Sequence, residues 1–166
     1  GGCTVEAAEA VCSETGEEAS ALAGLAALID RSLLRQQDDS TEAPRLVLLE
    51  TLREYGVERL EASEEAETLR RLHAGHFLGL TEAAEPELSG ARGREWGVRL
   101  EREHDNLRAA LRWALDSDDK EMGLRLTGAL WRFWSARGHL SEGGQWLREA
   151  LASATDLSTG AAGARG

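Results

Sequence analysis

The stretch from Leu124 to Leu151 constrains the fold more than any other part of the chain. It reads LRLTGALWRFWSARGHLSEGGQWLREAL, and apolar residues recur at helical spacing on both sides of Gly138. Gly138 is expected to end the first helix, because glycine takes positive φ without strain. Ser141 is expected to cap the second helix through its side-chain oxygen. Two apolar helices joined by so short a loop predict an antiparallel helical hairpin.

The spacing within this hairpin resembles that of a tetratricopeptide repeat. The matching positions are Leu130, Trp134, Gly138, Leu140, Gly143, Leu147 and Ala150. Trp131 departs from the pattern because a small residue is usual there, and Thr155 departs because Pro is usual. An unrelated helical hairpin is the alternative. We expect the Trp131 indole to cover Gly143. We also expect neighbouring helices on both sides of the hairpin, because one such unit cannot bury its own apolar face.

The N-terminal part of the chain shows a different order of elements. Val5–Cys12 and Ala19–Ser32 have helical periodicity, whereas the period changes at 33–36 and 45–48, which look like two short strands joined by a polar loop. Helix, helix, strand, loop and strand is the order of a winged-helix domain that lacks its beginning. Two helices with an isolated hairpin are the alternative, although a lone two-stranded hairpin is marginally stable in water.

The sequence therefore predicts a mostly α-helical chain in three parts. A partial winged-helix domain with a small β-hairpin covers 1–62, and an α-α superhelix of tetratricopeptide-like repeats covers 63–152. Further helices are expected at about 49–62, 63–84, 94–102 and 105–115, the last one capped by Asp105 or Asn106. The small and polar residues 153–166 are expected to form a flexible tail.

The charge is unevenly distributed along the chain. Residues 1–90 carry 7 basic and 19 acidic side chains, a net charge of −12, whereas the whole chain has −11. Because an acidic surface repels the phosphate backbone, we expect no nucleic acid to bind this segment. No stretch approaches the length of a membrane span, so we expect no membrane partner and a cytoplasmic location.

The sequence offers no convincing catalytic, cofactor or metal site. His73 and His76 have the i, i+3 spacing of a ligand pair, but no third ligand is evident, and we interpret them as packing residues. His104 precedes Asp105, yet no nucleophile accompanies the pair. No phosphate-binding GxxxxGK[ST] motif is present, and the Trp residues are expected in the core. We therefore predict that the segment is not an enzyme.

Five blocks of sequence, taken in order, resemble one family. They are GGCTVEAAEAVC, LAALIDRSLLRQ, RLVLLETLREYGVERLEA, EHDNLRAALRWAL and LWRFWSARGHLSEGGQWLREAL. They are similar to the bacterial signal-transduction ATPases with numerous domains, which include large transcriptional regulators of the LuxR and antibiotic-regulatory classes. The resemblance implies an ATPase module before Gly1, further repeats after Gly166, and a winged helix that packs on the ATPase and does not read DNA.

One departure concerns nucleotide sensing. Many members of this family place a His before an acidic residue after the second strand, and here that pair is Leu49-Glu50.

Our main functional prediction is a non-catalytic regulatory and protein-interaction segment of a larger ATPase-type transcriptional regulator. The alternatives are a DNA-binding winged-helix protein and a helical enzyme.

The expected partner is a protein or peptide, or another domain of the same regulator. In tetratricopeptide superhelices the first helix of each repeat lines the concave face. The matching positions here are Arg125, Gly128, Arg132 and Ser135. Two Arg side chains on one face can hold carboxylates, so these four residues are our candidate partner-binding site for an acidic segment. A solvated helix face is the alternative.

Overall fold

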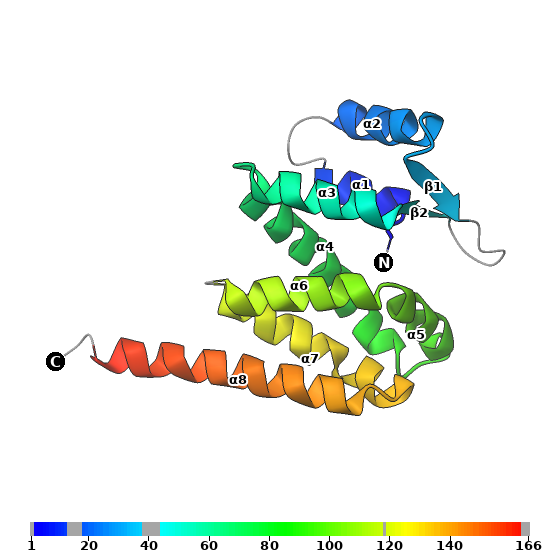
Figure 1. Cartoon of the computed structure of the whole chain (residues 1–166). Helices are drawn as coiled ribbons and strands as arrows, with labels where there is room; N and C mark the ends of the chain where they lie inside the picture. Colours follow the sequence, from blue (N-terminus) through cyan, green and yellow to red (C-terminus); the bar gives the residue numbers. More distant parts are fainter. Residues whose placement is uncertain (1, 13–17, 38–43, 118, 164–166) are drawn as a thin grey trace. The chain divides into compact units, whose positions relative to one another are not determined.

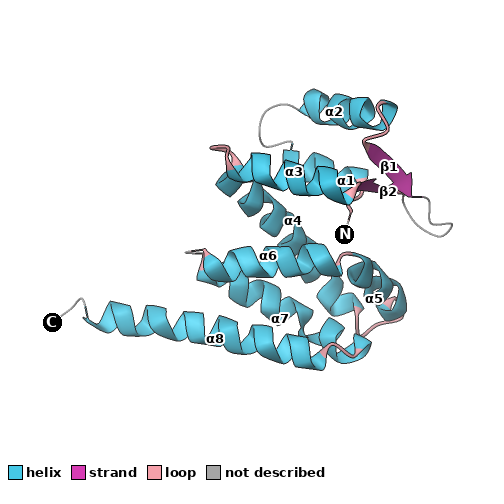
Figure 2. Cartoon of the chain, viewed as in Figure 1, coloured by secondary structure: helices cyan, strands magenta, loops and turns pink. Residues whose placement is uncertain are grey.

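The protein is mostly helical, with one small antiparallel hairpin among the described residues (Figures 1 and 2). The computed structural model describes residues 2–12, 18–37, 44–117 and 119–163, and side chains within 2–12, 21–37, 44–117 and 119–154. The chain forms two compact units, Gly1–His76 and Phe77–Gly166. The domain boundary expected from the sequence lies earlier, between 62 and 63. None of the described helices has the length and apolar character needed to cross a membrane.

The N-terminal unit has the predicted order of helices and strands and forms a winged-helix domain. The order is α1 (Val5–Cys12), α2 (Glu18–Asp30), β1 (Leu34–Gln37), β2 (Arg45–Leu48) and α3 (Glu50–Glu61). The two strands pair antiparallel with Leu34 opposite Leu48 and Gln37 opposite Arg45. The mostly α-helical fold with a small β-hairpin is thereby confirmed.

A third backbone segment extends the small sheet. Cys3 forms an isolated antiparallel bridge with Leu46, in which Cys3 N donates to Leu46 O at 3.0 Å and Leu46 N donates to Cys3 O at 2.7 Å. Ala7 of α1 and Leu34 and Leu46 of the hairpin are buried apolar residues of this unit. This bridge explains how a marginal hairpin is held, because the residues before α1 cover one of its edges.

The turn from α2 into β1 has an unusual backbone. Ser32 has φ of 58°, which is left-handed, and the Leu33 N–H donates to the Leu28 carbonyl at 2.9 Å. Such a left-handed residue after the last helical turn is typical of a helix C-cap, where glycine is preferred. The turn fixes the direction in which the chain leaves α2 and enters β1.

The C-terminal unit is a series of packed helices. They are α5 (Gly93–Arg102), α6 (His104–Asp116), α7 (Lys120–Arg137) and α8 (Leu140–Gly163), together with the second half of α4 (Ala66–Glu87). The most extensive pairings join α7 to α8 and α6 to α7. The core is apolar and includes Phe77, Leu100, Leu107, Leu111, Leu126, Leu130 and Phe133, all at most 2% exposed.

Helix boundaries differ from the sequence predictions in several places. Gly138 ends α7 with φ of 86°, as expected, but α8 begins at Leu140, so Ser141 lies inside the helix and is not its cap. Helix α6 begins at His104 with Glu103 as its N-cap residue, and no side chain caps it. Helix α8 continues to Gly163 and so runs into the segment from residue 153 that was expected to form a flexible tail.

Candidate functional site

The exposed side of α2 is the first candidate surface. In a helix-turn-helix motif the second helix enters the DNA major groove, and α2 holds that position after α1. Its exposed side chains are mostly small or apolar: Leu22, Ala23, Gly24, Ala26, Ala27, Ile29 and Asp30. Helix α2 itself has no basic residue. The described exposed side chains, from Leu22 to Asp30, would therefore contact a base edge mainly through van der Waals contacts.

Two exposed arginines follow α2 directly. Arg31 follows Asp30, the last residue of α2, and Arg35 lies on β1, and neither forms an ion pair within the described part of the chain. Two other arginines of this unit, Arg45 and Arg53, are engaged. The Arg45 guanidinium donates to the Gly2 carbonyl at 2.6 Å, and Arg53 donates to Glu50 at 2.6 and 3.0 Å. Arg31 and Arg35 are therefore the cations of this surface that remain available to a phosphate.

The second candidate surface is the predicted partner-binding face of α7. Arg125 and Arg132 both point toward α4. Arg125 donates two hydrogen bonds to Glu82, at 2.9 and 3.0 Å. Arg132 lies 3.7 Å from Glu85 and donates to Ser89 Oγ at 3.1 Å. The two positive charges on which the prediction rested are thus already partnered by the helix beside them.

The other two residues of that face are open. Gly128 and Ser135 are exposed, and a Cβ atom built on Gly128 would meet nothing within 4 Å. The four predicted residues therefore lie on an accessible side of α7. An acidic partner would have to compete with Glu82 and Glu85 for the arginines.

Trp134, and not Trp131, covers Gly143. A Cβ atom on Gly143 would lie 2.6 Å from two carbons of the Trp134 ring, and Trp134 is only 2% exposed. Trp131 is 45% exposed, and the Arg132 guanidinium lies 4.6 Å from its ring centroid. The predicted contact between Trp131 and Gly143 is wrong because the buried face of α7 is centred on Leu130 and Trp134, which turns Trp131 outward.

Ion pairs join α6 to α8 across the helical unit. Arg108 donates two hydrogen bonds of 2.7 Å to Glu142, and Arg112 donates to Glu149 at 3.0 Å. The Arg108 hydrogen bonds lower the pKa of Glu142 to about 2, and a hydrogen bond from the Trp146 indole acts in the same direction. Glu142 is therefore ionised at any ordinary pH and acts as a fixed anion between the two helices.

The structure places the four histidines in two groups. His73 and His76 are half-buried on α4. His104, at the start of α6, is 9% exposed, and it lies beside Glu101 and His139 from other parts of the unit. From the sequence, His104 was paired only with its neighbour Asp105. Nothing in the local sequence signals its proximity to His139, which follows from the packing of α5 and α6 against the α7–α8 hairpin.

Comparison with known proteins gives two findings. Residues 1–61 match the family model described as a winged helix-turn-helix domain. The chain is also 34% identical over 152 residues to proteins from Mycobacterium bovis and from two strains of Mycobacterium tuberculosis, which bear the provisional name HTH-type transcriptional regulator. The match covers 91% of this chain and 17% of the length of each relative. No solved structure matches the chain significantly.

These findings overturn one prediction. The expectation that this segment binds no nucleic acid is wrong, because the winged-helix match and the similarity to named transcriptional regulators point to DNA. The expectation rested on net charge, which averages over the whole surface, whereas a winged helix contacts DNA through a few side chains on one face. The alternative interpretation, a DNA-binding winged helix, is better supported than the main one.

Proposed function

We propose that the N-terminal unit contacts DNA as the winged-helix module of a transcriptional regulator. The observation that carries the proposal is the match of residues 1–61 to the winged helix-turn-helix family. The same residues form two helices, two strands and a third helix, in this order along the chain. The named regulators that the chain resembles support it. An enzymatic role has no comparable support.

The proposed contacts divide into two kinds. Arg31 and Arg35 bind backbone phosphates, because they are exposed cations at the end of α2 and on the adjoining strand. The exposed alanines of α2 and Leu22 face the groove, where small apolar side chains contact thymine methyl groups. Sequence preference therefore comes from apolar contact and from groove shape more than from bidentate hydrogen bonds.

The charge of the unit predicts modest affinity. Residues 1–61 carry 5 basic and 13 acidic side chains, a net charge of −8. Asp30 is exposed at the end of α2, beside the proposed phosphate contacts. Repulsion from these carboxylates opposes binding, so we expect the interaction to be clearest at low ionic strength.

The proposal is tested by measuring DNA binding of the whole chain by fluorescence anisotropy. The probe is a library of labelled duplexes whose central base pairs are randomised. We expect saturable binding at low salt and enrichment of a subset of sequences on repeated selection. The double variant Arg31→Ala with Arg35→Ala should bind at least about tenfold more weakly, since each phosphate contact carries part of the affinity. Arg59→Ala, which removes an exposed arginine of α3, is the matched control and should bind like the wild type. No binding at low salt, or equal losses in both variants, would contradict the proposal.

A second candidate function is protein binding by the helical unit. The supporting observation is the open side of α7, where Gly128 leaves space for a backbone and Arg125 and Arg132 stand on either side. An acidic segment of a partner, or of another domain of the same regulator, would replace Glu82 and Glu85 as the partners of these arginines. The ATPase module and the additional tetratricopeptide-like repeats that the family resemblance implies stay predictions.

Charge reversal tests this second function in the full-length regulator. Arg125→Glu with Arg132→Glu is expected to leave the fold intact and to weaken capture of the acidic segment or alter regulation. Gly128→Ala, which has open space around its added methyl group, is a milder variant on the same face. If folding and regulation are both unchanged in the charge-reversal variant, the face is an ordinary solvated surface.

A further inference from the structure

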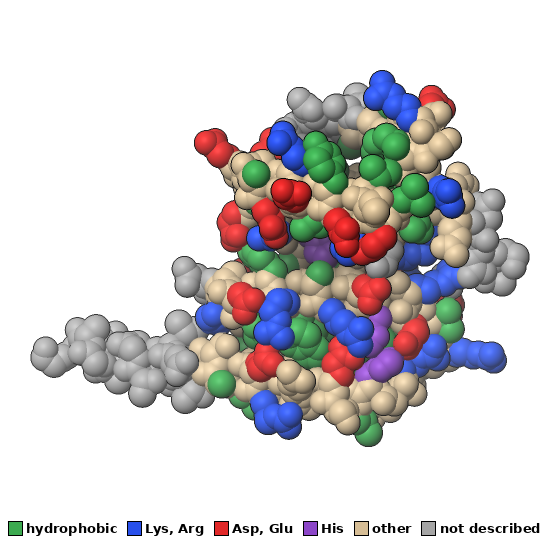
Figure 3. All heavy atoms as spheres, viewed as in Figure 1, with side chains coloured by type: hydrophobic (Ala, Val, Ile, Leu, Met, Phe, Trp, Pro, Cys, Tyr) green, Lys and Arg blue, Asp and Glu red, His purple; other side chains and the backbone are tan. Residues whose placement is uncertain are grey.

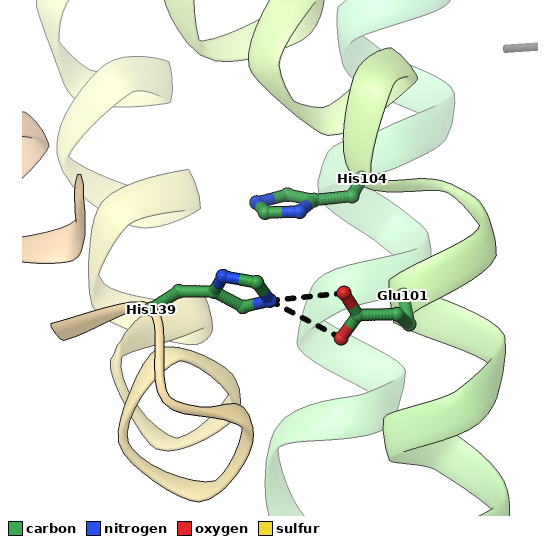
Figure 4. Close-up of side chains that lie close together, drawn as sticks. All are labelled: Glu101, His104 and His139. Carbon is green, nitrogen blue, oxygen red and sulfur yellow. Dashed lines mark hydrogen bonds and ion pairs between the residues drawn. The ribbon is translucent and has the colours of Figure 1, made fainter.

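We infer that Glu101, His104 and His139 form a binding site for a zinc ion in the helical unit. Their ligand atoms, one carboxylate oxygen and one nitrogen from each imidazole, all lie within 4.8 Å of one another. Figure 4 shows the three side chains pointing toward one another from α5, from the start of α6 and from the segment between α7 and α8. Two imidazoles with one carboxylate are a donor set that Zn²⁺ commonly takes in proteins.

The geometry requires only small movements of side chains. His139 Nε2 already lies 3.0 and 3.2 Å from the two oxygens of Glu101, and the rings of His104 and His139 have centroids 4.4 Å apart. Ligands of a tetrahedral zinc ion, with bonds of about 2.0–2.2 Å, are separated by roughly 3.4 Å. The widest separation in the cluster must therefore shrink by about 1.4 Å at most.

His104 independently points to a ligand at this cluster. It is 9% exposed, and its Nε2 has no hydrogen-bond partner within the described residues, although Glu142 Oε1 lies 3.3 Å away. Buried polar atoms without a partner are uncommon in folded proteins, and an ion bound to this nitrogen would satisfy it.

The charges around the cluster favour a cation. Glu101 and Glu142 both border it, and Glu142 is held in place by Arg108. Figure 3 shows histidine side chains reaching the surface of the helical unit between acidic and basic side chains, so an ion can enter from solvent. Because Arg108 already engages both oxygens of Glu142, we assign the fourth position on zinc to water.

Arg137 is the competitor for the site. Its Nε lies 3.2 Å from Glu101, so its guanidinium partly neutralises the carboxylate that the metal needs. Binding of Zn²⁺ would displace this ion pair and the hydrogen bond between His139 and Glu101. Removing Arg137 should therefore raise the affinity for zinc. If the cluster served only as an internal ion-pair network, the same substitution would only remove one of its ion pairs.

Zinc titration of the untagged chain, against a chromogenic competitor chelator, is the direct test. We expect the wild type to bind one Zn²⁺ per chain. His139→Ala and Glu101→Gln should each bind zinc at least about tenfold more weakly. Loss of a group that only orients a ligand typically lowers metal affinity by about this factor, and loss of the ligand itself should lower it at least as much. Arg137→Gln should bind more tightly. Both weakening variants alter half-buried side chains, so we expect the fold to be retained. Circular dichroism checks this expectation.

His73→Gln is the matched control, since it removes a histidine of the same chain outside the cluster. It should bind zinc like the wild type. Co²⁺ used in place of Zn²⁺ should give the strong visible absorption of a four-coordinate ion in the wild type and in His73→Gln, and not in His139→Ala. Less than one zinc per chain, equal affinity in His139→Ala and wild type, or equal losses in His139→Ala and His73→Gln would overturn the assignment.

Discussion

Gly143 allows the closest approach between α7 and α8. A methyl group at this position would lie 2.6 Å from the Trp134 ring, a separation that real side chains do not adopt. Trp134 is fully packed and cannot move aside without disturbing the core. We predict that Gly143→Ala lowers the free energy of unfolding by about 1–3 kcal/mol through overpacking. Chemical denaturation of the whole chain measures this.

The neighbouring residue supplies the control for that prediction. A methyl group on Gly144 would meet only the end of the Arg148 side chain, at 3.9 Å. Because alanine favours the helix over glycine, Gly144→Ala should raise stability by roughly 0.5–1 kcal/mol. If the two substitutions shift stability in the same direction, the close contact between Gly143 and Trp134 is not what limits this hairpin.

Trp131 and Trp134 of α7 should differ sharply in their importance for stability. Trp134 is 2% exposed, and its truncation to alanine should cost about 3–5 kcal/mol. Trp131 is 45% exposed and stacks with Arg132, so Trp131→Ala should cost about 1 kcal/mol or less. Thermal melting of both variants checks the difference. Equal losses would mean that Trp131 is covered in solution, for example by a neighbouring repeat.

Local sequence could predict some of these residues and not others. Gly138 was predictable because a left-handed residue at the end of a helix is a local requirement. The choice between Trp131 and Trp134 depended on the rotation of α7 about its axis, which is fixed by contacts with other helices. The proximity of His104 to His139 depends in the same way on tertiary packing, so spacing along the chain carried no sign of it.

At the scale of elements, α6 and α8 are tied together by charge as well as by apolar packing. The Arg108–Glu142 pair has two hydrogen bonds of 2.7 Å, and its side chains are 48% and 23% exposed. After allowance for solvent screening, we predict a coupling of about 0.5–1 kcal/mol from a double-mutant cycle with Arg108→Ala and Glu142→Gln. The cycle should be measured in chelator, so that bound metal does not contribute.

The Arg92–Glu95 pair is the control for this cycle. It also has two hydrogen bonds, but its side chains are 55% and 61% exposed and both lie at the start of one helix. We expect no measurable coupling there. Added salt should weaken the Arg108–Glu142 coupling only partly, and its complete loss at moderate salt would mean that the pair behaves like a surface pair.

Strands and amphipathic helices were the most predictable elements. Strand β2 has the predicted bounds, and β1 is shifted by one residue from the predicted 33–36. The bridge between Cys3 and Leu46 could not be predicted, because it joins residues that are far apart in the sequence and depends on the fold of the whole unit. Caps were predicted poorly at Ser141 and Asp105, where the helices begin one residue before the expected cap.

At the scale of the whole molecule, the distribution of charge determines how the chain can approach DNA. The net charge is −11, and most of the excess acid lies in the half that contains the winged helix. Net charge predicts long-range repulsion, but it does not report where the few available cations lie. This is why composition led to the wrong prediction on nucleic acid, while the order of helices and strands led to the right fold.

The salt dependence of DNA binding should reveal how many cations take part. Each phosphate neutralised on duplex DNA contributes about −0.9 to the slope of log K against log salt concentration. With Arg31 and Arg35 as the phosphate contacts, we predict a slope of roughly −2 for the whole chain. The slope should approach zero in the double variant Arg31→Ala with Arg35→Ala and stay unchanged in Arg59→Ala. A slope steeper than about −4 would show that the basic side chains of the helical unit also bind phosphates. In that case the acidic winged helix could not be the principal DNA contact, and the proposed division of contacts between α2 and the two arginines would fail.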